Sequence, residues 1–275
     1  MLRRQFLLTS SSLLGLAACA TPGVSTRDGQ RPSEGGIGGT GIVGLLTDFG
    51  SLIVNGLRVE TDRKTQFTAA FGPISESALH VGQSLTIEAR TRGGTLVARR
   101  VHLTHALIGT VTPGGRVAGT PVLLEAGTIG RLTPGQRVAV SGVWRGHSVI
   151  ASRIDPAPDG DDVIAGEIQF TASAMVGRTA LHGGAVLNSL KPGQFVTLRG
   201  QSHGGQMTVQ QAQPERFTGA AGALRRLSVE GFLAPDNSAP GYRLDGLGHS
   251  FSARSRLAAF AARRGRNHQI ALESP

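Results

Sequence analysis

Apolar and polar residues alternate with a period of two along much of the chain, in short runs separated by glycine-containing turns. Three of these runs share the form Gly-Gln-x-apolar-x-apolar, and they begin at Gly82, Gly135 and Gly193. Alternation of this kind is typical of a strand with one buried face, and a glycine before the strand permits a tight turn. The pattern predicts three β-hairpins, with these three glycines as structural turn residues.

The three runs stay in register beyond their first strand. Each is followed by a polar turn that contains glycine, at residues 92–94, 145–147 and 203–205, and then by a second alternating run. At two equivalent positions in that second run the three copies have apolar residues: Leu96, Val149 and Met207 at the first, and Ala98, Ala151 and Val209 at the second. We expect these six side chains to lie in the core.

Another glycine-led apolar run precedes each hairpin, and a fourth occurs near the end of the chain. These runs begin at Gly44, Gly109, Gly166 and Gly231. Run and hairpin together make a unit of about 55–65 residues with four or five short strands. Because an isolated hairpin is barely stable in water, each unit must close on itself or pack on its neighbours. The prediction is an all-β fold of tandem small OB-like, Greek-key β-barrel repeats, with an N-terminal lipoprotein signal and a short C-terminal helix.

The repeat boundaries divide the chain into six segments. They are a signal peptide at 1–18, a lipidated N-terminus and flexible tether at 19–40, β-repeats at 41–106, 107–163 and 164–222, and a divergent fourth repeat at 223–275. The fourth repeat lacks the Gly-Gln hairpin. In its place, residues 255–264 are predicted to form a short helix that Gly265 ends, before a last strand over 268–272. A degenerate terminal unit is typical of the end of a repeat array.

The first nineteen residues have the features of an export signal. Arg3 and Arg4 precede an apolar stretch at residues 6–16, which is too short to span a bilayer permanently. The stretch leads into Leu-Ala-Ala and Cys19, and this resembles a bacterial lipobox, in which the cysteine is acylated and becomes the mature N-terminus. Arg3 and Arg4 resemble a twin-arginine export motif. The alternatives are general secretion as the export route, and an ordinary cleaved signal with a cysteine nearby.

Lipidation at Cys19 would hold the protein on a membrane surface. Residue 20 is alanine rather than the aspartate that would suggest retention at the inner membrane. We therefore expect a lipid-anchored protein of the cell envelope that faces the periplasm, at the outer membrane.

The glycine-rich start of the first unit carries a family resemblance. Residues 35–41 read Gly-Gly-Ile-Gly-Gly-Thr-Gly, and residues 49–56 read Phe-Gly-Ser-Leu-Ile-Val-Asn-Gly. With the later hairpins, these segments resemble the bacterial DUF5666 family over about residues 35–215. The resemblance implies an exported protein built of small repeated β-domains, and the family's function is not established. Its motifs are turns and strands, so it implies no catalytic residue.

Composition narrows the classes of function. The chain has 275 residues, a formal net charge of +10, 40 glycines and a single cysteine. One cysteine excludes a disulfide scaffold and a cysteine-based zinc site. The positive charge could suit nucleic acid, but such barrels need aromatic stacking platforms, and the chain has one Trp and one Tyr. We expect no nucleic-acid partner.

Few residues are spaced for chemistry. Among the eight histidines, only His102 and His105 are close in sequence, and they are the candidate metal ligands if a turn separates them. The acidic segment 155–162 is predicted to be a solvated linker rather than a calcium loop. The chain lacks the common hydrolase and zinc-protease motifs, so we expect neither an enzyme nor a cofactor.

These features predict a non-catalytic envelope lipoprotein that acts as a binding or scaffold module for an envelope protein or polysaccharide. The alternative is a periplasmic ligand-binding protein for a metal ion or an anionic glycan. The sequence leaves the oligomeric state open.

Overall fold

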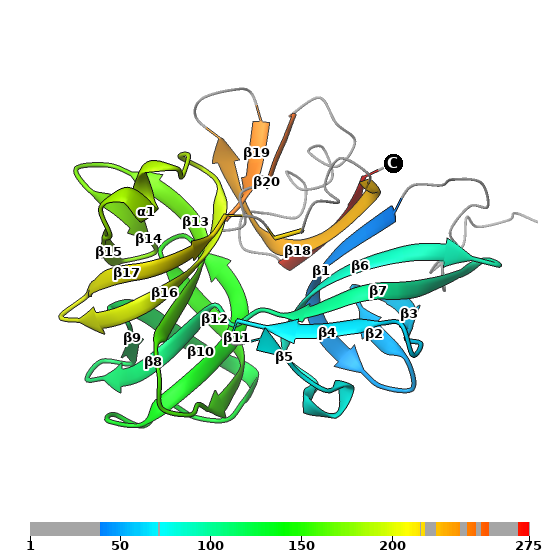
Figure 1. Cartoon of the computed structure of the whole chain (residues 1–275), viewed down its shortest axis with the longest axis horizontal. Coiled ribbons are helices and arrows are strands. Elements are labelled where there is room, and N and C mark those ends of the chain that lie inside the picture. The colour runs from blue at the N-terminus through cyan, green and yellow to red at the C-terminus, as the bar shows by residue number, and fades with distance from the viewer. Residues whose placement is uncertain are drawn as a thin grey trace, which may run out of the picture. The chain divides into compact units, whose positions relative to one another are not determined.

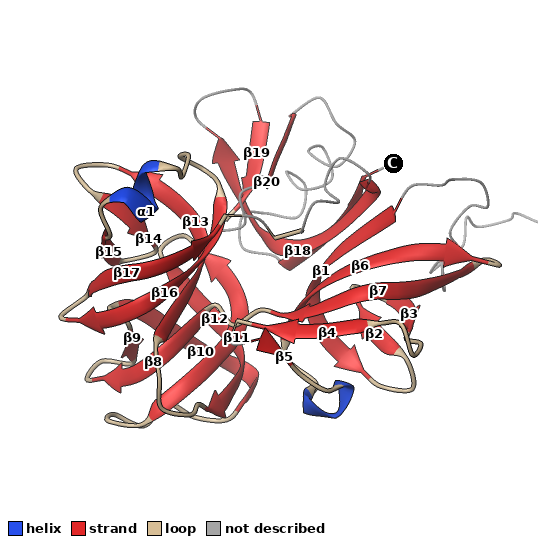
Figure 2. Cartoon of the chain, in the orientation of Figure 1, coloured by secondary structure: helices blue, strands red, loops and turns tan. Residues whose placement is uncertain are grey.

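The structure is a computed structural model that describes residues 39–70, 72–214, 216–217, 224–236, 241–245, 249–252 and 269–274. Strands dominate this part of the chain, as predicted, and the helical elements within it are short (Figure 2). None of its helices has the length and apolar character needed to cross a membrane. The predicted signal, Arg3, Arg4, Cys19 and the helix at 255–264 lie outside the described residues.

The first unit closes through five strands. They are β1 (Gly39–Asp48), β2 (Leu52–Val54), β3 (Leu57–Glu60), β6 (Ser84–Arg92) and β7 (Thr95–Leu103). The pairing runs β1–β2–β3–β7–β6 and returns to β1, and the β3–β7 pair is parallel. An insertion between β3 and β6 adds β4 (Gln66–Ala69), β5 (Gly72–Pro73) and the 3₁₀ helix η1 (Glu76–Ala78), and β4 pairs with β7.

The second and third units are closed five-stranded barrels with the same connectivity (Figure 1). The second has β8 (Leu107–Thr112), β9 (Arg116–Val117), β10 (Thr120–Ile129), β11 (Arg137–Arg145) and β12 (Ser148–Pro156). The third has β13 (Asp162–Phe170), β14 (Ala174–Val176), β15 (Thr179–His182), β16 (Phe195–His203) and β17 (Gln206–Gln213), with α1 (Ala185–Asn188) between β15 and β16. As in the first unit, the third and fifth strands of each barrel pair in parallel. Tandem OB-like barrels are therefore the architecture, as the sequence predicted.

The Gly-Gln motif has the same role in all three barrels. Gly82, Gly135 and Gly193 adopt φ values of +90°, +83° and +78°. The N–H of each donates to a carbonyl of its barrel's first strand at 2.8 Å: those of Leu46, Val111 and Ile168. Each motif therefore turns the chain and fastens the start of the fourth strand to the first. The following hairpins also share a β-bulge at one equivalent position.

The predicted core positions are buried. Leu96, Val149 and Met207 are at most 4% exposed, and the three residues at the second position are at most 5% exposed. The first barrel has its own core around Ile42, Leu85 and Ile87. The cores of the second and third barrels join in one cluster that also includes Val229 and Leu233 of the fourth unit.

The fourth unit departs from the barrel plan, as its sequence does. It contains β18 (Leu224–Asp236), β19 (Gly241–Leu244), β20 (His249–Ser252) and β21 (Gln269–Ser274). β18 pairs with β19 and β21, and it also runs parallel to β1 of the first barrel. The last repeat thus extends the sheet of the first. The first strands of the second and third barrels, β8 and β13, pair with each other as well.

Candidate functional site

The two candidate metal ligands lie at the end of the first barrel. His102 is in β7, and His105 follows it in the connection to β8. His102 Nδ1 is 2.9 Å from Thr68 Oγ1, whereas His105 Nδ1 is buried and has no hydrogen-bond partner within the described residues. Burial lowers the pKa of both histidines to about 4, with Arg100 and Arg216 adding to the effect at His102. The described residues contain no group of three or more His, Cys, Asp or Glu side chains suited to a metal ion. The metal role of this pair stays a prediction.

Contacts between backbone and side chain join the first two barrels. Ser84, at the start of β6, accepts a hydrogen bond from Gly142 N at 3.0 Å and donates to Gly142 O at 3.1 Å. Nearby, Ser152 Oγ donates to the carbonyl of Gly82 at 2.6 Å. The Gly-Gln turn of the first barrel is therefore also a contact with the hairpin of the second.

Trp144 connects the second barrel to the third. Its side chain leaves β11 and is 2% exposed, and Nε1 donates to the carbonyl of Ala165 in β13 at 2.9 Å. Two glycines of the third barrel make room for the ring. A Cβ built on Gly166 would lie 3.0 Å from the indole, and one built on Gly177 would lie 2.6 Å from it. The single tryptophan of the chain is therefore a buried wedge and offers no stacking platform.

The acidic segment between these barrels is not a solvated linker at its C-terminal end, contrary to the prediction. Asp162 is 7% exposed and pairs with Arg137 of β11 at 2.5 Å, while Ser202 of β16 donates to it through both its N–H and its hydroxyl. Asp161 accepts from Arg199 and Gln201 of the third barrel at 3.0 and 2.9 Å. Closure of the two barrels brings Arg137 to the carboxylate of Asp162 and to the backbone carbonyl of Asp161, which linear sequence spacing could not indicate.

A groove of about 690 Å³ lies between the second and third barrels, close to Asp162. Its polar lining includes Thr110, Thr112 and Arg116 from the second barrel, and Ser202 and His203 from the third. The backbones of the two barrels approach closely at its glycines: a Cβ on Gly119 would lie 2.4 Å from the Cα of Gly205.

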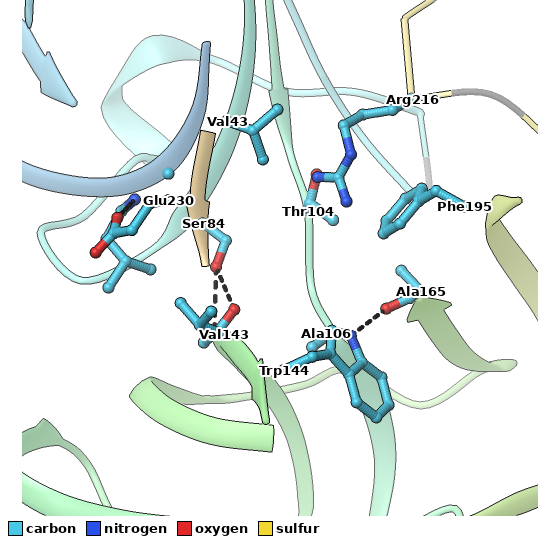
Figure 3. A pocket seen from close by; sticks show the side chains of 13 residues that line it. Val43, Ser84, Thr104, Ala106, Val143, Trp144, Ala165, Phe195, Arg216 and Glu230 are labelled. Carbon is cyan, nitrogen blue, oxygen red and sulfur yellow. Dashed lines mark hydrogen bonds between the residues drawn. The ribbon is translucent and has the colours of Figure 1, made fainter. Parts of the chain in front are cut away.

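A much smaller cavity of about 30 Å³ lies where the barrels and β18 meet (Figure 3). Val43 and Ser84 line it from the first barrel, Trp144 from the second, Phe195 from the third and Glu230 from β18. Arg216, which follows β17, also lines it. Its guanidinium stacks over the Phe195 ring, with Cζ 3.5 Å from the ring centroid. Burial lowers the pKa of Arg216 to about 9, so the group stays charged at neutral pH.

The first barrel coincides with a known domain. Its five strands begin at residue 39 and end at residue 103, and one family model covers nearly the same range. Residues 40–102 match the DUF5666 family. The family is described as a domain of unknown function, so the match supplies no activity. No curated protein and no solved structure matches the chain at the significance we required.

The DUF5666 match is narrower than the resemblance over 35–215 that the sequence suggested. The second and third barrels repeat the strand order of the DUF5666 domain, but the family model does not extend to them. Sequence reasoning found the hairpins because glycine and alternation mark them. It missed Trp144, Arg137 and Arg216, which act between units and have no counterpart in the repeat.

Proposed function

We propose that this protein is a non-catalytic lipoprotein of the cell envelope, anchored through Cys19, whose barrels form a scaffold that binds another envelope protein. The proposed location in the cell envelope rests on the lipobox-like sequence at residues 16–19. The scaffold role is supported by the interfaces, where buried polar groups such as Asp162 and Arg137 bind each other across barrels. Side chains committed in this way are not free for acid–base chemistry.

One observation on β10 of the second barrel indicates the binding surface. β10 pairs with β12 on one side, whereas on the other side its ladder with β9 ends at Pro121 and the last backbone hydrogen bond runs from Val122 N to Gly115 O at 2.9 Å. Beyond that point, Leu123 and Leu124 are 38% and 51% exposed. No strand in the described part of the chain pairs with this edge at Leu123 and Leu124, and a free strand edge with exposed leucines is a template for a strand of another chain. We propose that β10 receives an extended apolar segment of the partner.

Site-specific photo-cross-linking of the full lipoprotein in intact cells tests this proposal. A photoreactive residue at Leu124 should give one discrete adduct with an envelope protein. The same residue at Phe170, which is 43% exposed at the end of β13, is the matched control and should give none. Adducts of equal yield at both positions, or none at Leu124, would overturn the docking role of β10.

A second candidate function rests on the groove between the second and third barrels. Its volume, its hydroxyl groups and the positive charge of Arg116 suit a short segment of an anionic glycan. In OB-like barrels, loops between strands bind oligosaccharides, and residues 203–205 form such a loop. Retention of the protein on an immobilised anionic polysaccharide, lost in Arg116→Gln but kept in Arg58→Gln, would favour this function. Equal retention of both variants would exclude the groove.

A further inference from the structure

The cavity at the meeting point of the barrels contains a positive charge, that of Arg216, which stacks on Phe195 but pairs with no acid in the described part of the chain. Arg216 Nε and Nη2 are buried and have no hydrogen-bond partner among the described residues, and the contact of Nη1 with Thr86 Oγ1 is long at 3.4 Å. The guanidinium points between Thr104 and Phe195 (Figure 3). A buried charge without a partner costs several kcal/mol, on the order of the stability of a whole domain. Two donor nitrogens of the guanidinium, Nε and Nη2, are therefore without an acceptor among the described residues.

The nearest acid in the cavity does not answer that charge. Glu230 lines the opposite side, where its Oε2 accepts from Leu45 N at 2.8 Å. Among the described residues, no ion pair joins Glu230 or any other acid to Arg216. Burial also raises the pKa of Glu230, which disfavours its charged form.

The volume of the cavity limits what can enter. About 30 Å³ accommodates a monatomic ion or one or two water molecules. A sugar, a nucleotide or a carboxylic acid with a carbon chain is too large. Aromatic and aliphatic side chains, such as those of Phe195, Val43 and Trp144, form much of the lining. Such a lining suits a weakly hydrated ion better than a strongly hydrated one.

We propose that this cavity is a binding site for a single small anion of the size of chloride, with Arg216 as its ligand. The anion would accept from Nε and Nη2 and neutralise the guanidinium. Since the lining comes from three barrels and β18, binding would stabilise their junction. This site is independent of the β10 edge and of the groove, so its failure would leave both proposed functions standing.

The thermal stability of the mature protein in chloride and in gluconate, at equal ionic strength and pH 7, tests the site. Gluconate is too large for the cavity, so the midpoint of unfolding should rise with chloride and not with gluconate. The rise should vanish in Arg216→Gln. Arg145→Gln is the matched control, because Arg145 also stacks on a phenylalanine, with Cζ 5.5 Å from the centroid of Phe232, but its side chain is 37% exposed and pairs with Glu125. Arg145→Gln should therefore keep the rise in unfolding midpoint with chloride.

A second measurement covers the case in which Arg216→Gln does not fold. Crystals of the unaltered protein grown in bromide should show an anomalous peak within hydrogen-bond distance of Arg216 Nε. A water molecule at that place, or equal stabilisation by chloride and gluconate, would overturn the proposal.

Discussion

Trp144 of the second barrel donates its indole N–H to the carbonyl of Ala165 in the third barrel, at 2.9 Å. The bond passes from one repeat to the next, and the ring lies against two glycines whose lack of a side chain makes the contact possible. Together with the Ser84–Gly142 and Arg137–Asp162 contacts, it makes the tandem barrels one packed structure rather than independent domains on a chain.

Replacement of Trp144 measures how much its contact between the two barrels contributes to the free energy of unfolding. Trp144→Ala should lower the free energy of unfolding by about 3–5 kcal/mol, because it empties a buried site shared by two barrels. Trp144→Phe should cost about 1–2 kcal/mol, since it keeps most of the ring and leaves the Ala165 carbonyl unpaired. Chemical denaturation gives both values. Phe49→Ala, at a side chain 44% exposed, is the control and should change stability by less than about 0.5 kcal/mol.

A comparison of two glycines with nearly equal φ values measures the stability cost of crowding at the contact between the second and third barrels. Gly119 and Gly114 have φ values of +85° and +81°, but only at Gly119 would a Cβ meet backbone, 2.4 Å from Gly205 Cα. Alanine at either position has the same cost, about 1 kcal/mol, for its left-handed conformation. Gly119→Ala should cost at least about 1–2 kcal/mol more than Gly114→Ala, because the barrels must move apart. Equal losses in thermal denaturation would show that this approach does not constrain the barrels.

Loss of the buried Arg137–Asp162 ion pair should lower the stability more than loss of the exposed Arg145–Glu125 pair. Asp162→Asn leaves Arg137 without its charge partner in a site where both side chains are under 15% exposed, and it should cost about 2–4 kcal/mol. Glu125→Gln breaks the pair with Arg145, whose members are 51% and 37% exposed, and should cost less than about 1 kcal/mol. Urea denaturation of the two variants compares them. A loss at Asp162 no greater than at Glu125 would contradict a structural role for the acidic segment.

The repeat could be recognised in the sequence because glycine turns and alternating apolar residues are local patterns. Gly82, Gly135 and Gly193 mark turns, and strict alternation after them marks strands, so hairpins and core positions could be predicted. The contacts between barrels depend on residues that differ from copy to copy. Trp144, for example, occupies a position where the other hairpins have Thr91 and Ser202.

Tertiary closure explains the remaining differences from the sequence prediction. Asp162 looked solvated because Arg137 is far from it along the chain, and only the folded barrels bring the two together. The parallel pairing of β18 with β1 joins the last repeat to the first, and no periodic signal specifies such a partner. The charge on Arg216 is notable only in the folded protein, where Nε and Nη2 are buried and no described residue accepts a hydrogen bond from them.

The two histidines predict how stability depends on pH. Both have a pKa of about 4 in the folded protein, against 6.5 when exposed in the unfolded chain. Between these values the unfolded state binds more protons, so their contribution is fully present above pH 6.5 and is lost as the pH falls toward 4. Each histidine contributes a loss on the order of 3 kcal/mol. His102→Gln should flatten the decline between pH 6.5 and 4, whereas the exposed His147→Gln should not. Unfolding midpoints measured across this range would contradict the assignment if both variants kept the full slope.

Calorimetric unfolding of the mature protein tests most directly whether the barrels form one packed scaffold. The shared core of the second and third barrels, the Trp144 wedge and the β1–β18 pairing predict a single transition, with a calorimetric enthalpy equal to the van't Hoff enthalpy. Trp144→Ala should split that transition or lower it as a whole. Separate transitions for the individual barrels in the unaltered protein, each indifferent to Trp144→Ala, would contradict the account.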